Sequence, residues 1–128
     1  DFFMAEQLIP KKPYFIRAMF DWISDNNYTP HILIDSSVDN VCVPNEFIEN
    51  DRITLNISYS ASNNLEINSN SISFDARFNG KSVNVNIPCE AVMNIFAKET
   101  GEGMVFSVEN ENREEIKKEK RSHLKLVE

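Results

Sequence analysis

Near residue 28 the apolar residues of this chain change from helical to alternating spacing, and that change limits the folds open to it. Before it, residues 13–26 carry apolar side chains at helical spacing, and Pro13 suits a first helical position because its missing N–H would be unpaired there. After it, short runs alternate apolar and polar side chains, as half-buried strands do. Asn79-Gly80 separates two of these runs and is a strong hairpin signal, because both residues tolerate positive φ. Up to residue 87 the pattern predicts one helix followed by antiparallel strands.

The alternating segments predict about six short strands. They cover residues 29–35, 41–43, 52–58, 65–67, 71–78 and 81–87, and residues 104–106 form a last short strand or extended segment. Val92, Ile95 and Phe96 repeat at helical spacing after Pro88, which predicts a second helix over 88–99 that Gly101 ends. The expected fold is therefore mainly β with flanking helices, a small antiparallel β-sandwich or barrel-like domain.

The helix predicted over 13–26 carries more apolar surface than one packing contact requires. Its two stripes are Phe15, Met19 and Trp22, and beside them Ile16, Phe20 and Ile23. The extra stripe can lie under the sheet or against a second copy of the same helix, and the sequence alone leaves both open.

The 128 residues fit one domain, and the net charge of −7 argues against bulk binding to nucleic acid or an anionic membrane. Residues 1–106 hold 14 acids and 7 bases, whereas residues 107–128 hold 6 of each. The segment 107–120 has too few large apolar residues for a core, and predicts a linker or a marginal helix. No apolar stretch is long enough to span a membrane. Cys42 and Cys89 are expected as two buried free thiols in a reduced compartment, so the predicted location is the cytoplasm.

The chain offers no catalytic constellation. His31 and His123 are its two histidines, and no Cys, His or carboxylate cluster has metal-ligand spacing, so we expect a protein without metal or cofactor that is not an enzyme. His31, inside an apolar strand, is expected to be a packed side chain. An RNA- or ribosome-associated small barrel stays as the alternative, but it requires basic grooves with aromatic platforms. A peptide that pairs with a sheet edge fits better, although the sequence does not identify the edge strand.

Several short sequences occur in the order and spacing of one known family. They are Lys11-Lys12-Pro13-Tyr14, Asp21-Trp22, Asp25-Asn26, Thr29-Pro30-His31, Val43-Pro44, Leu55-Asn56-Ile57, Asn64-Leu65, Phe74-Asp75-Ala76-Arg77-Phe78 and Ala97-Lys98-Glu99-Thr100-Gly101. Over residues 10–106 the chain resembles the stringent starvation protein B (SspB) family. Members of that family are dimeric adaptors that carry ssrA-tagged polypeptides to the ClpXP protease. The resemblance implies a small β-sandwich with an N-terminal dimerisation helix and a peptide groove on each subunit.

The resemblance also implies site residues. For the peptide groove they are Val43, Pro44, Asn45, Phe74, Asp75, Ala76, Arg77, Met104, Val105 and Phe106, and for the dimer interface Phe15, Met19 and Trp22. Ala76 matches a small residue at the groove floor, and Arg77 is expected to meet a tag carboxylate. For Phe74 and Phe78 an ordinary core role is an equal alternative.

The C-terminal residues resemble the ClpX-docking motif of the same family, which is basic and then aliphatic. The implied docking residues are Arg121, Leu124, Lys125, Leu126 and Val127. Ser122 stands where the family commonly has proline, and Glu128 stands where it has a basic residue. The implied organisation is an N-terminal extension at 1–10, a peptide-binding domain at 11–106, a linker at 107–120 and a docking tail at 121–128. A flexible linker of that length would span about 20 Å r.m.s..

Overall fold

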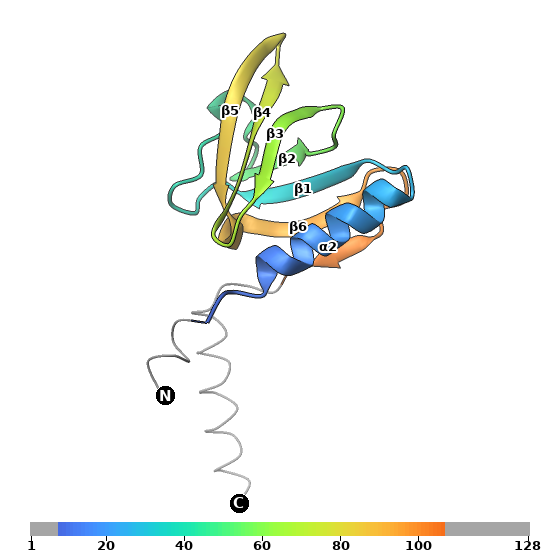
Figure 1. Ribbon diagram of the computed structural model, residues 1–128. Helices are drawn as coiled ribbons and strands as arrows, with labels where there is room; N and C mark the ends of the chain where they lie inside the picture. Colours follow the sequence, from blue (N-terminus) through green and yellow to red (C-terminus); the bar gives the residue numbers. More distant parts are fainter. Residues whose placement is uncertain (1–7, 107–128) are drawn as a thin grey trace, which may run out of the picture.

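The computed structural model describes residues 8–106 and contains one long helix and seven strands within them (Figure 1). The elements are α2 (Lys12–Asp25), β1 (Pro30–Asp35), β2 (Arg52–Asn56), β3 (Ser62–Ile67), β4 (Ser71–Phe78), β5 (Lys81–Pro88), β6 (Val92–Ala97) and β7 (Gly103–Val105), with short 3-10 turns η1 (Asn45–Phe47) and η2 (Cys89–Ala91). Within these residues no helix is both long and apolar enough to cross a membrane. The proposed linker and docking tail lie outside the described residues.

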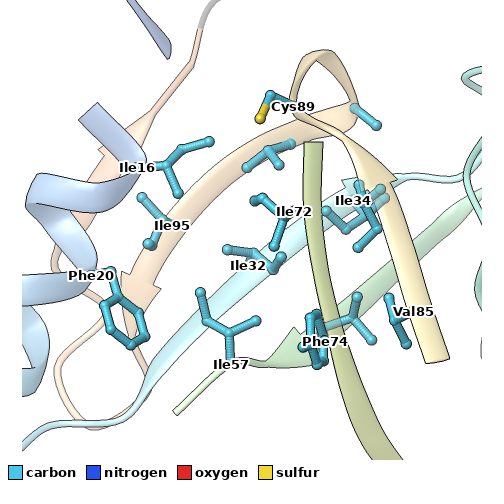
Figure 2. Close-up of a cluster of buried hydrophobic side chains, with 14 of the residues drawn as sticks. Ile16, Phe20, Ile32, Ile34, Ile57, Ile72, Phe74, Val85, Cys89 and Ile95 are labelled. Atoms are coloured by element: carbon cyan, nitrogen blue, oxygen red, sulfur yellow. The ribbon is translucent and has the colours of Figure 1, made fainter. Parts of the chain in front are cut away.

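The strands form two antiparallel sheets that do not close into a barrel. One has the order β2-β1-β6-β7 and the other the order β3-β4-β5. Apolar side chains from both sheets and from α2 meet between them, among them Ile16, Ile32, Ile72 and Phe74 (Figure 2). The fold is therefore mostly β and sandwich-like, as the sequence predicts.

Helix α2 and the hairpin β4–β5 follow the local sequence closely. Pro13 lies in the first turn of α2, and Asn27 takes a left-handed φ of 61° just after the helix. The hairpin turns at Asn79 and Gly80, both with positive φ, as the Asn-Gly pair predicts. Ile53, Leu55 and Ile57 are all buried, so the predicted alternation in the run 52–58 is confirmed.

The predicted helix over 88–99 is wrong. Residues 89–91 form the short turn η2, and Val92–Ala97 form β6, a strand paired on both sides. The register shifts between Leu33 and Ile34, which pair with Asn94 and Val92, so Met93 is an extra residue in β6. Such a bulge breaks the two-residue alternation. The buried positions Val92 and Ile95 therefore stand three apart and imitate the spacing of a helix.

Two smaller predictions concern the burial of the cysteines and of His31. Cys89 is buried but Cys42 is exposed, so only one of the two predicted buried thiols is found, because Cys42 lies at an outer sheet edge. His31 is half-buried on β1 and packs edge-on against Phe96, with 5.7 Å between ring centroids. Burial lowers the pKa of His31 from its ordinary value. Among residues 8–106, no His, Cys, Asp and Glu side chains gather into a group that could hold a metal.

Candidate functional site

A cavity of about 510 Å³ opens between the loop that follows β1 and the hairpin β4–β5. It is lined by Cys42, Val43, Pro44, Glu46, Phe78, Asn79, Lys81, Val83 and Asn84. The ring of Phe78 also packs against Phe47 of η1, with 4.9 Å between centroids, which joins the loop to the hairpin. The cavity thus has a wall from each segment and an aromatic residue where the two segments meet.

One wall of the cavity is the outer edge of β5, which is paired at Asn86 but open at Ser82 and Asn84. β5 ends the order β3-β4-β5, and on its outer side Cys42 pairs with Asn86 through two main-chain hydrogen bonds of 2.8 and 3.2 Å. Main-chain groups of a strand point alternately to its two sides. Those of Ser82 and Asn84 therefore point the same way as those of Asn86, away from β4. No described strand covers them, so the edge can accept an extended chain.

A row of polar side chains crosses the outer face of this sheet and ends at that edge. The Nδ2 of Asn84 donates to one carboxylate oxygen of Asp75, and the Nδ2 of Asn64 donates to the other, both at 3.0 Å. The bond from Asn84, followed by the one from Asn64, lowers the pKa of Asp75 below its ordinary value. Asp75 therefore stays ionised at neutral pH and connects the edge strand to β3.

The charge and chemistry of the cavity favour a polar ligand without strong net charge. Its ionisable side chains include one base, Lys81, and one acid, Glu46. Arg77 lies nearby in the hairpin and donates to the main-chain oxygen of Gly80 at 3.3 Å. The exposed thiol of Cys42 is also part of the lining, whereas burial raises the pKa of Cys89 to about 11. Only Cys42 is therefore accessible to thiol reagents at neutral pH.

The structure brings part of the expected peptide-binding set to this cavity. Val43 and Pro44 line it, and Asn45 follows them at the start of η1. Asp75 contacts the lining residue Asn84, and Arg77 is exposed at the end of β4. These five residues lie at or beside one site.

The other expected peptide-binding residues lie elsewhere. Phe74 and Ala76 point into the core, with 1% and 7% of their surface exposed. Met104 and Val105 belong to β7, an edge strand of the other sheet, and Phe106 follows it; none of the three lines the cavity. Their role in peptide binding stays a prediction.

The two stripes of α2 have different surroundings. Ile16, Phe20 and Ile23 are buried in the core, where Figure 2 shows Ile16 and Phe20, while Phe15 and Trp22 stay 46% and 43% exposed. Met19 is half-buried and packs against the edge of the core. The stripe expected at a dimer interface is therefore the one that the sheets do not cover.

Several cavity residues were missed by the sequence reasoning, namely Cys42, Glu46, Asn79, Lys81, Val83 and Asn84. The Asn-Gly turn already placed Lys81 and Val83 opposite β4, but nothing in the sequence identified β5 as an edge. The expected ClpX-docking residues 121–127 lie outside the described residues.

Comparison with known proteins finds one family. A family model described as stringent starvation protein B matches residues 10–126. A curated protein of Haemophilus influenzae (strain ATCC 51907 / DSM 11121 / KW20 / Rd), described as a stringent starvation protein B homolog, is 42% identical over 100 residues. The match covers 78% of this chain and 67% of that protein. Both matches include the loop and the hairpin that form the cavity.

Proposed function

The chain belongs to the stringent starvation protein B family, and we propose that it is an adaptor that binds ssrA-tagged polypeptides and tethers them to the ClpXP protease. The observation that carries the proposal is the open edge of β5 beside the cavity. An exposed edge can accept an extended peptide through main-chain hydrogen bonds, and adjacent pockets supply selectivity for its side chains. That division suits an adaptor that holds a tag without chemically changing it.

The cavity supports a bound peptide in a specific way. Cys42 already occupies the position of a partner strand beside Asn86. A peptide lying next to Ser82 and Asn84 would continue that line toward the hairpin turn, with Val43 and Pro44 on its other side. The free thiol of Cys42 is also consistent with a reducing compartment, and we propose a cytoplasmic location.

Delivery requires a second contact. We assign it to residues 121–127, which would bind ClpX while the domain holds the tag. A tether makes the second binding event intramolecular, with an effective concentration of about a millimolar for a short flexible link. The adaptor thus raises the local concentration of substrate at the protease.

We test tag binding by titrating a fluorescent ssrA peptide before and after Cys42 is alkylated with a bulky maleimide. Alkylation should weaken binding at least ten-fold, because the adduct would fill the space beside the β5 edge. Cys42→Ser treated in the same way is the control, since Cys89 is buried and its thiol pKa is about 11. Absence of binding by the untreated protein would disprove the proposed function. Unchanged binding by the alkylated protein would move the site away from this cavity.

The exposed stripe of α2 supports a homodimer. Trp22→Glu should convert a dimer into a monomer of 14.7 kDa, because a charge would have to be buried at the interface. Light scattering coupled to size exclusion measures the mass. Thr54→Glu, on the exposed side of β2, should leave the mass unchanged. A Trp22→Glu protein that keeps the dimer mass would exclude this stripe as the interface.

A further inference from the structure

Asp75 fixes the orientation of the Asn84 side-chain amide. A carboxylate only accepts hydrogen bonds, so the Asn84 side chain must turn its NH₂ group toward Asp75. The Asn84 carbonyl oxygen then faces away from Asp75 and can accept a hydrogen bond from another partner, while the second N–H of the same amide can still donate. The reverse orientation would bring that oxygen against the negative carboxylate. Because Asn64 engages the second oxygen of Asp75, the carboxylate is itself held from both sides.

Asn84 also lies where a bound strand would pass. Its main-chain groups point to the open edge of β5, and its side chain is part of the cavity lining. Residues that face each other on neighbouring strands have their side chains on the same side of the sheet, about 5 Å apart. The peptide residue opposite Asn84 would therefore present its side chain to the Asn84 carbonyl oxygen.

We propose that Asp75 is a positioning residue that makes the β5 edge selective for an extended peptide with a hydrogen-bond donor opposite Asn84. The matching side chains are the amides of asparagine and glutamine and the hydroxyls of serine and threonine. The inference rests on the proposed function, because it assigns a selective role within the same peptide site. One hydrogen bond of this kind corresponds to about a three- to ten-fold preference in affinity.

A purely structural role for Asp75 makes a different prediction. Asp75 is only half-buried and makes no ion pair within the described residues, so its removal should change stability little. If Asp75 acts on specificity, its removal should instead change the order of the peptides by binding affinity. The ranking is therefore the measurement that separates the two roles.

The experiment compares Asp75→Asn with the wild type against a set of ssrA peptides in which each polar residue is replaced singly by alanine. An asparagine at 75 can donate to Asn84, so the Asn84 amide is free to reverse. We expect one peptide replacement to weaken wild-type binding about three- to ten-fold, and that ratio to fall to about one in Asp75→Asn. Asp39→Asn, at an exposed loop acid, should keep the wild-type ratio.

The outcomes separate the two levels of the proposal. Wild-type protein that binds no tagged peptide overturns the proposed function and this inference with it. Wild-type protein that binds, but with no sensitive peptide position, overturns the inference alone. If a peptide replacement weakens binding to the wild type and to Asp75→Asn by the same factor, the inference alone is also overturned. Thermal unfolding of both variants checks that the comparison is made on folded protein.

Discussion

Replacing Phe74 by alanine should lower the free energy of unfolding by about 3–5 kcal/mol, because the truncation leaves a cavity in the core. The ring is 1% exposed and lies where the two sheets meet (Figure 2). A small domain is stable by about 5–15 kcal/mol in total, so much of the stability would be lost. Chemical denaturation followed by fluorescence of Trp22 or by circular dichroism measures the change. Val105→Ala, at an 80% exposed position, should change stability by less than about 0.5 kcal/mol.

The same position tests whether Phe74 contacts the peptide. Phe74→Leu keeps an apolar side chain and should remain folded at a cost of about 1 kcal/mol. If Phe74 is only a core residue, the folded Leu variant should bind the ssrA peptide as the wild type does. A ten-fold loss of affinity in a folded Leu variant would instead support a direct contact.

A substitution at Ala76 can also change the fold and peptide binding at once. It lies in the core beside Val83 and is 7% exposed, so Ala76→Gln would force a larger polar side chain among apolar neighbours. Loss of peptide binding in that variant could follow from loss of the fold. Substitutions at the cavity surface, such as those at Cys42 and Asp75, locate the site more cleanly.

Most of the fold follows from local patterns. The alternation of apolar side chains predicts the run 71–78 that becomes β4, with Ile72 and Phe74 buried as expected. Asn79 and Gly80 predict the adjoining turn, because few other residue pairs adopt positive φ easily. These features can be predicted because each is determined by residues that are close together in the chain.

The wrong predictions fall where the structure is determined by pairing between segments that are distant in the sequence. β6 pairs with β1 and β7, and the bulge at Met93 shifts the phase of its buried residues, which no local pattern reveals. Prediction of the site from the sequence has the same limit, because the site also depends on strand pairing. The resemblance indicated Val43 and Pro44, but Asn84 becomes a candidate only when β5 is known to be an edge strand and Cys42 to lie against it.

Deleting residues 121–128 should abolish the adaptor's stimulation of ClpXP degradation while leaving peptide affinity within about two-fold of the full chain. The described residues that line the cavity lie between 42 and 84, far from the deleted segment in the sequence, so we expect peptide binding to survive the deletion. Under the proposed tethering, the deletion removes the second contact and the effective concentration that it supplies, so degradation should return to the rate without adaptor. Fluorescence loss of an ssrA-tagged fluorescent protein measures delivery, and the peptide titration measures binding.

A matched control separates the docking sequence from its charge. Residues 121–127 in scrambled order keep length, composition and net charge, so they preserve any nonspecific attraction to ClpX. We expect the scrambled chain to deliver no better than the deletion, because the proposed docking residues Arg121, Leu124 and Leu126 would no longer keep their spacing. Full delivery by the scrambled chain would show that the contact with ClpX depends on charge and not on the residue order. Full delivery by the deletion would show that the body itself reaches the protease, and loss of peptide affinity in the deletion would make the tail part of the peptide site.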